Sequence, residues 1–264
     1  MKKCSKGAGL KVAGNNTIPL PSSAEIQPEF WRVIECVVSK LTFSFPELIH
    51  SLYVYGSVAE GRAETGKSDL DMTIIFRQKL AQTTAEQLYK IHAELERNNS
   101  TISKIDFDCG CLEEVISQDN ILSWGYWLKH HCRCVYGEDL SQHFQPFKPS
   151  KAIAVAVNGD FQQVLSRLIK QMKMSSDEIK KQQLLCSAAR KLIRSTNILR
   201  NEQDYEWPGS LNEHRNWFIA RYPSLEKDID DLIAIGTGGK GNLDDYEKQL
   251  ITFASWLNAE FRRY

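Results

Sequence analysis

Two pairs of aspartates stand out as residues that could do chemistry together. Asp69 and Asp71 alternate inside an apolar run, in KSDLDMTIIF, and Asp106 and Asp108 repeat that spacing in SKIDFDCG. Side chains two positions apart on a strand point to the same face, so each pair predicts two carboxylates projecting together. Burying neighbouring carboxylates is costly unless a cation neutralises them. The pattern therefore predicts a site for Mg²⁺, which takes hard oxygen ligands and leaves positions for phosphates.

A phosphate-binding turn is predicted beside these carboxylates. Gly56 and Ser57 follow a short apolar run, where a strand would turn into a helix. Glycine lets the backbone approach a phosphate, and the neighbouring N–H groups and the serine hydroxyl can hold its oxygens. Ser68, directly before Asp69, adds another hydroxyl. A phosphate cradle next to a carboxylate cluster is the equipment of metal-assisted phosphoryl transfer, for which about two Mg²⁺ ions are expected.

The elements that must position these residues are strands first and helices later. Hydrophobic periodicity predicts strands and helices up to residue 131, over Pro28–Leu41 (helix), Leu52–Tyr55 (strand), Asp69–Phe76 (strand), Thr84–Asn98 (helix), Ser103–Gly110 (strand) and Trp124–His131 (helix). Further along it predicts helices only, over Gly159–Met174, Asp177–Arg200, Leu211–Ala220, Ser224–Ile235 and Leu243–Arg262. The predicted fold class is α+β, a mixed β-sheet flanked by helices followed by an all-α helical bundle.

Composition divides the chain into three parts. Residues 1–24 are rich in Gly, Lys, Asn, Pro and Ser and show no apolar period, which is typical of a flexible arm. The two prolines of FQPFKPS, Phe144–Ser150, predict a hinge. We therefore expect the mixed-sheet domain over residues 25–147 and the helical domain over residues 148–264.

The glycine–serine turn and the first aspartate pair together carry a resemblance to a family. GSVAEGRAETGKSDLDM, Gly56–Met72, matches Gly-Ser-x-Ala-x-Gly, a short spacer, and Ser-Asp-x-Asp followed by an apolar residue. This resembles the signature of the DNA polymerase beta-like nucleotidyltransferase superfamily, and within it the aminoglycoside (streptomycin/spectinomycin-type) adenylyltransferases with a C-terminal helical domain. The resemblance implies that Gly56 and Ser57 bind phosphate and that Asp69 and Asp71 bind metal.

A third carboxylate is expected on the third strand. SKIDFDCGCLEEV fits the family pattern of an apolar residue, an acid and another apolar residue, which gives the role to Asp106, with Asp108 as the alternative. Similarity to members that act on small hydroxyls implies a general base near the metals. Asp69, Asp71 and Asp106 are therefore both the expected catalytic residues and the expected metal ligands.

Basic residues of the helical half are candidates for the nucleotide. In SAARKLIRSTNILR, Arg190 and Arg194 share a helix face at i and i+4, and Lys191 lies beside them. Basic residues of the helical domain reach the triphosphate in similar adenylyltransferases, so all three are expected to bind nucleotide. Ordinary surface cations are an equally weighted alternative.

The expected function is metal-dependent transfer of a nucleotide, with AMP from ATP as the leading case, to a hydroxyl of a small molecule such as an aminoglycoside antibiotic, with release of pyrophosphate. Transfer to tRNA or to protein, as in toxin and antitoxin pairs, stays open. The segment Lys148–Arg200 has eleven basic residues against three acidic ones, which favours RNA, whereas a net charge of zero does not. A nucleotide-binding regulator without turnover is the alternative from another class.

Composition also bears on location and on other sites. The N-terminus is charged without an apolar core segment, no transmembrane run is present, and the seven scattered cysteines fit a reducing cytoplasm. HHCRC and CGC lack the spacing of a structural zinc site. GTGGKG, Gly236–Gly241, lacks the Lys-[Ser/Thr] of a phosphate loop and is expected to link two helices. DYEWPGS, Asp204–Ser210, predicts either part of an acceptor pocket or a turn with an inward tryptophan.

Overall fold

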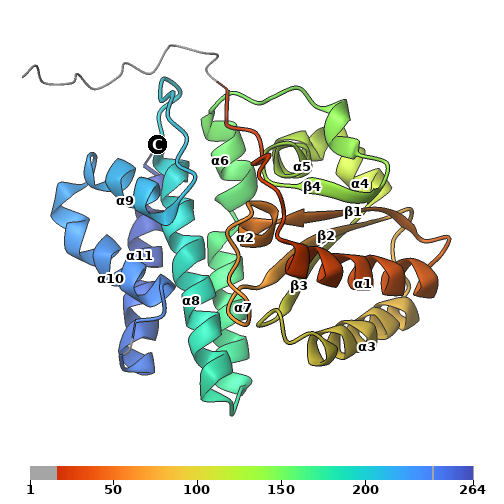
Figure 1. Cartoon of the computed structure of the whole chain (residues 1–264). Helices are drawn as coiled ribbons and strands as arrows, with labels where there is room; N and C mark the ends of the chain where they lie inside the picture. The colour runs from red at the N-terminus through yellow and green to blue at the C-terminus, as the bar shows by residue number, and fades with distance from the viewer. Residues whose placement is uncertain (1–16, 240, 264) are drawn as a thin grey trace, which may run out of the picture.

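The computed structural model describes residues 17–239 and 241–263 as a mixed sheet with its helices next to a bundle of longer helices (Figure 1). The strands are β1 (Ile49–Tyr55), β2 (Leu70–Phe76), β3 (Ile105–Cys111) and β4 (Arg133–Gly137). The helices are α1 (Pro28–Ser44), α2 (Gly56–Ala59), α3 (Gln82–Asn98), α4 (Leu112–Ile116), α5 (Tyr126–His130), α6 (Lys151–Asn158), α7 (Phe161–Met174), α8 (Glu178–Ser195), α9 (Leu211–Ile219), α10 (Glu226–Gly236) and α11 (Leu243–Phe261). The predicted α+β class is confirmed.

The sheet has the strand order β3-β2-β1-β4. Strand β1 runs antiparallel to both β2 and β4, and β2 runs parallel to β3 through the connection that contains α3. The register pairs Asp71 with Tyr55 on one side and with Asp106 on the other. Because paired residues on neighbouring strands project to the same face, this register determines which side chains meet at the site.

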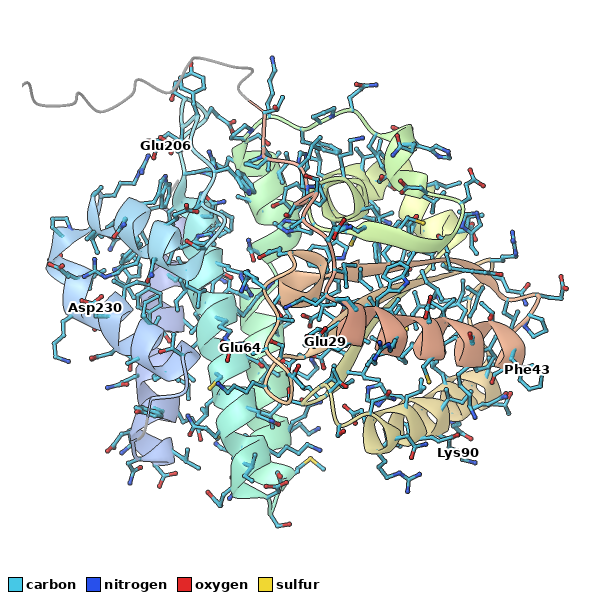
Figure 2. The ribbon with its side chains drawn as sticks, in the orientation of Figure 1. Glu29, Phe43, Glu64, Lys90, Glu206 and Asp230 are labelled. Atoms are coloured by element: carbon cyan, nitrogen blue, oxygen red, sulfur yellow. The ribbon has the colours of Figure 1, made fainter. Side chains whose placement is uncertain are left out.

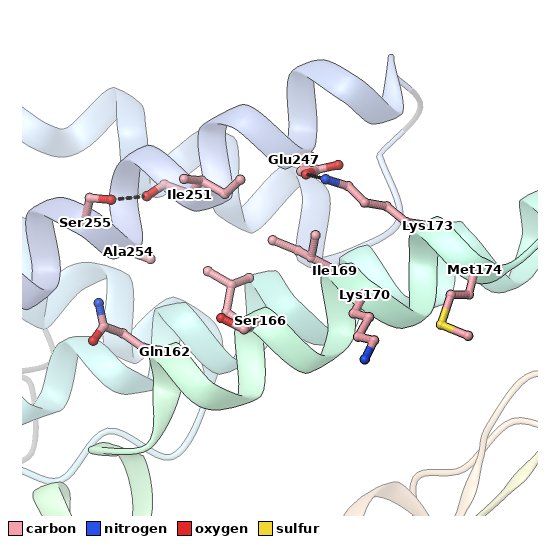
Figure 3. A pocket seen from close by; sticks show the side chains of 11 residues that line it. Gln162, Ser166, Ile169, Lys170, Lys173, Met174, Glu247, Ile251, Ala254 and Ser255 are labelled. Atoms are coloured by element: carbon pink, nitrogen blue, oxygen red, sulfur yellow. Dashed lines mark hydrogen bonds and ion pairs between the residues drawn. The ribbon is translucent and has the colours of Figure 1, made fainter.

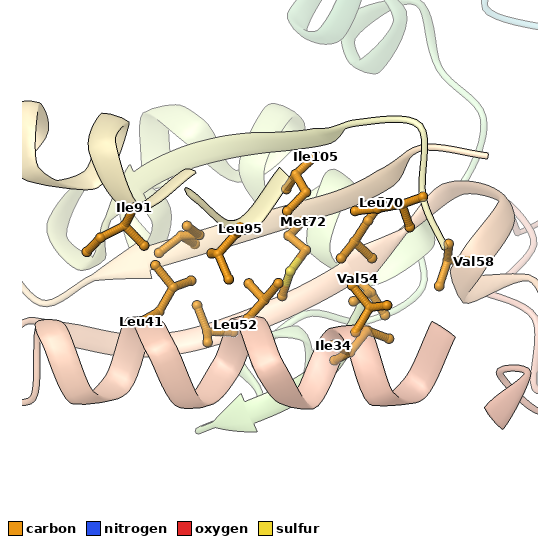
Figure 4. Packing of buried hydrophobic residues seen from close by; sticks show 14 of the residues in the cluster. Ile34, Leu41, Leu52, Val54, Val58, Leu70, Met72, Ile91, Leu95 and Ile105 are labelled. Atoms are coloured by element: carbon orange, nitrogen blue, oxygen red, sulfur yellow. The ribbon is translucent and has the colours of Figure 1, made fainter. Parts of the chain in front are cut away.

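One face of the sheet is buried under α1 and α3. The predicted apolar face of the second strand, Leu70, Met72, Ile74 and Phe76, lies in this core at no more than 1% exposure (Figure 4). Helix α1 opens on a proline and contributes its stripe from Phe30 to Leu41 to the same core. Alternation then places Asp71 on the opposite face of the sheet, away from this apolar layer.

The opposite face is covered only in part. Tyr53 and Ile75 pack there against Val115, Leu128 and Leu140, which come from α4, α5 and the following turn. The register places the aspartates of β2 and β3 on this same face, toward the ends of the strands nearest α2. The apolar cover and the carboxylates therefore occupy different parts of one surface.

The helical half has its own core. Every helix predicted beyond residue 150 is present, although Gly159 and Asp160 lie before α7 and a 3₁₀ turn, Thr196–Leu199, replaces the last part of the predicted Asp177–Arg200 helix. Helix α6 was not predicted, and neither were α4 and β4. The core joins apolar side chains of α7, α8, α9, α10 and α11, among which Leu192, Phe218 and Leu257 are fully buried.

The predicted N-terminal arm differs from expectation where the structure describes it. Residues 1–16 lie outside the described residues, and residues 17–24 form no helix or strand. Ile18 is nevertheless 3% exposed, packs with Tyr126 and Ile153, and its N–H donates to the Phe147 carbonyl at 2.8 Å. Residues 17–24 are therefore bound along the protein, by burial of Ile18 and by the carbonyls of Pro19 and Ala24, which accept hydrogen bonds from His130 and Arg133.

The surface is mostly polar, with isolated apolar side chains. Figure 2 shows Phe43, 86% exposed, at the outer end of α1, and Glu206 in the loop after α8. Across residues 17–239 and 241–263, no helix has both the length and the apolar content needed to cross a bilayer. Single exposed apolar residues are ordinary on protein surfaces and need no partner.

A buried histidine in the helical half predicts acid sensitivity. His214 on α9 is 6% exposed, its Nδ1 has no hydrogen-bond partner, and burial, followed by Arg194 and Arg200, lowers its pKa to about 3. A depressed pKa means that stability is complete above about pH 6.5 and is lost as the pH falls toward 3. From pH 7 to pH 5, urea unfolding should show a loss of about 2 kcal/mol from this residue. His214→Phe should reduce that loss, and His143→Phe, at an exposed position, should not; equal losses in all three proteins would contradict the prediction.

Candidate active site

The predicted aspartates share one face at the β2–β3 junction. Asp69 precedes β2, Asp71 lies in β2, and Asp106 is the direct partner of Asp71 on β3, with Asp108 two residues further along opposite Thr73. Burial, then the charges of Asp106 and Asp69, raise the pKa of Asp71 to about 7. Asp71 makes no hydrogen bond or ion pair with any described residue. Negative charge is therefore in excess where Asp71 lies.

A lysine that the sequence analysis did not single out lies within this cluster. Lys104 is ion-paired with Asp106, and its Nζ is 3.4 Å from Asp69 Oδ2. The other oxygen of Asp69 accepts a hydrogen bond from the Ser103 hydroxyl. These two carboxylates raise the pKa of Lys104 despite its partial burial. Strand alternation in the sequence could have identified Lys104, because it stands two residues before Asp106 and so projects from the same face.

The predicted carboxylates share one face of the sheet, and their role as metal ligands stays a prediction. Among the described residues, no group of three or more His, Cys, Asp or Glu side chains is arranged to hold a metal ion. The physical reason is that Asp69 and Asp106 direct oxygens to the Lys104 ammonium. The donor chemistry nevertheless fits Mg²⁺, since the face offers carboxylate oxygens and Asp71 lacks a counter-charge. An ion would fit here once the Lys104 side chain moves.

The glycine–serine turn lies directly against the second aspartate. Gly56 begins α2 with φ +71°, and a Cβ at this position would collide with Asp71 Oδ2. Glycine is therefore required both by the backbone and by the carboxylate. Ser57 is half-buried beside it. The Ser68 hydroxyl accepts the Glu64 N–H at 2.9 Å and closes the turn before β2, and its predicted contact with the nucleotide stays a prediction.

Asp108, the alternative third carboxylate, has a different partner. The Tyr55 hydroxyl donates to Asp108 Oδ2 at 2.6 Å, and burial together with the Asp108 charge raises the pKa of Tyr55. The Tyr55 ring packs edge-on against Trp127, whose indole N–H donates to the Thr73 hydroxyl at 3.1 Å. Asp108 is exposed beside this aromatic pair, whereas Asp106 lies beside Asp71.

The three basic residues predicted to bind nucleotide have different surroundings. Arg190 donates from Nε to the Gly236 carbonyl at 2.7 Å, and Lys191 donates to the Val157 carbonyl at 3.0 Å and pairs with Asp160. Both therefore connect parts of the helical half. Arg194 differs from these two, because the charge of Asp71 acts on its guanidinium and no described residue forms a hydrogen bond or ion pair with that guanidinium.

The position of Arg194 is recessed. Its side chain is open to solvent, yet surrounding protein lowers its pKa, and so does the charge of Arg190. Asp71, Tyr55 and Tyr126 act in the opposite direction and raise it. The Arg194 guanidinium has no partner among the described residues, and the charge of Asp71 in the other half acts on it. It is therefore placed to bind a negatively charged group between the two halves.

Aromatic residues join the two halves beside this position. Trp207 donates its indole N–H to the Tyr126 hydroxyl at 2.9 Å, and the Arg200 guanidinium lies over the Trp207 ring at 4.6 Å. The predicted alternative of an inward tryptophan in Asp204–Ser210 is therefore what the structure shows. Gly236 ends α10 and α11 begins at Leu243, so GTGGKG links two helices as predicted, with residue 240 outside the described chain.

A groove of about 590 Å³ lies elsewhere, between α7 and α11 (Figure 3). Apolar side chains such as Ile169 and Ile251 line it, and Lys173 pairs with Glu247 at 2.7 Å at one end. Its lining includes no residue of the sheet and no pair of neighbouring carboxylates. The candidate active site is therefore the β2–β3 face, not this groove between α7 and α11.

Two comparisons with known proteins agree with this location. Residues 40–123 match the family model described as "Polymerase beta, Nucleotidyltransferase", a stretch that contains β1, β2 and β3. A crystal structure of a spectinomycin adenyltransferase from Enterococcus faecialis, solved with ATP and spectinomycin, has a similar fold. Its TM-score is 0.60 at 14% sequence identity, and the match covers 88% of this chain and 99% of that one. No curated protein sequence matches this chain.

The matched segment includes the glycine–serine turn and all four aspartates discussed above. The similarity to the adenyltransferase covers 88% of this chain, so it extends over both the sheet and the helical bundle. The resemblance predicted from Gly56–Met72 is confirmed. Residues 40–123 of this chain therefore form a nucleotidyltransferase domain of the polymerase beta type.

Proposed function

We propose that this enzyme transfers AMP from ATP to a hydroxyl of a small cationic molecule of the aminoglycoside type. The observation that carries the proposal is the packing of Asp71 over Gly56, which places a carboxylate with excess negative charge directly against a phosphate-binding turn. A carboxylate and a polyphosphate repel each other unless a cation lies between them. The similar protein from Enterococcus faecialis was solved with ATP and spectinomycin, which supports this choice of nucleotide and acceptor.

The metal ligands in this proposal are Asp69, Asp71 and Asp106. Bound Mg²⁺, with about two ions expected, would supply charge neutralisation for the triphosphate and for the oxygens entering and leaving phosphorus. Gly56 and Ser57 hold phosphate oxygens through the backbone N–H and the hydroxyl. Carboxylates of neighbouring strands fix these groups relative to one another, which is the positioning that phosphoryl transfer needs most.

The transfer itself needs one proton acceptor. The acceptor hydroxyl loses its proton to a carboxylate oxygen of Asp106, its oxygen forms the new bond to the α-phosphorus, and the bond to pyrophosphate breaks. Asp106 can take the proton only after its ion pair with Lys104 opens. Asp108, held by Tyr55, stays two residues further along the strand, where its charge attracts an amine of the acceptor.

Arg194 is proposed to bind the triphosphate from the helical half. Arg194→Met should raise the KM for ATP about 10- to 100-fold, because a guanidinium–phosphate contact in a recessed site is worth about 1.4–2.8 kcal/mol. Steady-state kinetics over a range of ATP concentrations would measure this effect. Arg190→Met is the matched control, since Arg190 is committed to the Gly236 carbonyl and should change thermal stability more than KM. An unchanged KM in Arg194→Met would remove Arg194 from the nucleotide site.

The acceptor can be identified by labelling. Purified protein is incubated with ATP labelled at the α-phosphate, with Mg²⁺ or with EDTA, and with spectinomycin, streptomycin, tRNA or a protein lysate in separate reactions. The proposal expects Mg²⁺-dependent label on an antibiotic and release of pyrophosphate. Label on tRNA or protein would identify the alternative nucleotidylation reaction, and ATP binding without transfer to any acceptor would identify a regulator.

We also propose the division into a nucleotidyltransferase domain over 25–147 and a helical domain over 148–264. The segment 144–150 contains no helix or strand, which supports a boundary there. A reducing, cytoplasmic location belongs to the same proposal and is supported by free thiols at Cys36, Cys109, Cys111, Cys132, Cys134 and Cys186.

A further inference from the structure

We infer that Lys104 is a built-in counter-cation of the active site and that a divalent ion binds by displacing it. This rests on the metal ligands of the proposed function and adds a residue that competes with the metal. Lys104 Nζ pairs with Asp106 Oδ2 and is 3.4 Å from Asp69 Oδ2. One ammonium therefore holds oxygens from two of the three carboxylates proposed to bind the ion.

The ammonium and a divalent ion compete for these oxygens. An ammonium has only donors, and it is attracted to the same carboxylate oxygens that would bind a metal. The remaining oxygen of Asp69 is already bonded to the Ser103 hydroxyl. A divalent ion that binds Oδ2 of Asp69 and Oδ2 of Asp106 would therefore lie against the Lys104 ammonium, and the repulsion between the two cations favours departure of the lysine side chain.

The structure gives Lys104 a place to go. Its side chain is 30% exposed, and it stands at the start of β3, next to the exposed Ser103. The flexible stem of lysine can turn to solvent, where its strongly hydrated ammonium is stable. Movement of one side chain is sufficient, and the strands need not shift.

The Lys104 ammonium neutralises only part of the negative charge on this face of the sheet. Lys104 offsets one charge, whereas Asp69, Asp71, Asp106 and Asp108 all act on this face. Asp71 lies in register with Asp106 and has no ion pair or hydrogen bond with a described residue, so its charge is not offset by a partner. A divalent ion offsets more of this negative charge than the ammonium does, so it can displace Lys104 from the carboxylates. In the metal-free protein, the Lys104 ammonium stabilises the fold.

Metal affinity measured without nucleotide tests this inference. Mn²⁺ is titrated into wild type and Lys104→Met in the absence of ATP, and free Mn²⁺ is read by electron paramagnetic resonance. Lys104→Met should bind Mn²⁺ about fivefold tighter, since a partly exposed ion pair is worth up to about 1 kcal/mol. Its thermal midpoint in EDTA should lie below that of wild type, and the difference should disappear with saturating Mn²⁺.

Two variants, Lys104→Arg and Lys67→Met, serve as matched controls. A third variant, Lys104→Gln, replaces Lys104→Met if that protein fails to fold. Lys104→Arg keeps the charge and should bind Mn²⁺ no tighter than wild type. Lys67→Met removes an exposed lysine that pairs with Glu64 outside the cluster and should behave as wild type. Lys104→Gln, which keeps a hydrogen-bond donor without charge, repeats the test if Lys104→Met does not fold.

The outcomes separate this inference from the proposed function. Tighter binding of Mn²⁺ in the uncharged variants, Lys104→Met and Lys104→Gln, supports the inference that the ion displaces the Lys104 ammonium. Equal or weaker binding in Lys104→Met and Lys104→Gln, with wild type still binding Mn²⁺, would overturn the inference and leave the proposed metal site in place. If wild type binds no Mn²⁺ with or without ATP, the metal site of the proposed function fails as well.

Discussion

Asp71→Asn should abolish nucleotidyl transfer, with kcat reduced at least about 10³-fold, because the amide keeps the shape of the carboxylate and removes the charge that must face a cation. Asp71 is the proposed ligand with no partner among the described residues, and it lies in register with Asp106 and against Gly56. Transfer of α-labelled phosphate to the acceptor identified above would measure the loss.

The same variant should be at least as stable as wild type when no metal is present. Neighbouring carboxylates crowd Asp71, so a neutral amide relieves repulsion in EDTA. Asp119→Asn, at an exposed position in the turn Gln118–Asn120, is the control and should change neither activity nor stability. Full activity in Asp71→Asn would contradict the proposed role, and a large loss of stability would mean that the residue is structural instead.

Gly56→Ala should also cause a large loss of both activity and stability. The new methyl group would collide with Asp71 Oδ2, and alanine would be held at φ +71°, which costs about 1–2 kcal/mol in backbone strain alone. The carboxylate or the turn must shift, and a shift of about 1 Å in a positioning group can reduce the rate about 100-fold. Kinetics and thermal unfolding of the purified variant would measure both effects.

Gly238→Ala separates backbone strain from the collision. Gly238 has φ +85°, and a Cβ there would meet nothing within 4 Å. This control should lose about the strain energy and keep its activity, since the residue follows α10, far along the chain from the carboxylates. If both glycine variants lose activity equally, the contact between Gly56 and Asp71 is not what the site requires.

Much of the sheet could be predicted because its sequence obeys simple alternation. Leu70, Met72, Ile74 and Phe76 form one buried face, and the same period places Asp71 on the other. The strand after Lys104 and the helices of the second half follow equally clear patterns. Elements that lack such a period were missed, for example the short edge strand β4, RCVYG, in which apolar and polar residues do not alternate regularly.

The contents of the site were harder to predict, because contacts between strands depend on register. Sequence left Asp106 and Asp108 as alternatives, and the pairing of β2 with β3 then placed Asp106 beside Asp71. The same pairing brings Lys104 close to Asp69, and the spacing of residues along the chain does not predict this contact. Helical spacing grouped Arg190 with Arg194, but only contacts with other helices distinguish them, through the bond of Arg190 to Gly236.

The arrangement links the two halves through few groups. Arg194 and Trp207 both belong to the helical half, and Trp207 donates its indole N–H to the hydroxyl of Tyr126 in the other half. A triphosphate between the sheet and α8 would therefore contact groups from both halves at once. This placement explains why the chain combines a sheet that carries carboxylates with a bundle that carries a recessed arginine.

The central claim is that Asp69 and Asp71 bind a divalent ion beneath the phosphates of a nucleotide. A crystal structure of the protein with Mn²⁺ and a non-hydrolysable ATP analogue, with the manganese located by anomalous scattering, tests it most directly. We expect manganese ligated by oxygens of Asp69 and Asp71 and by the triphosphate, with phosphates against Gly56 and with Lys104 withdrawn from Asp69. A nucleotide bound elsewhere, or one bound here without manganese while Lys104 still pairs with both carboxylates, would contradict the claim.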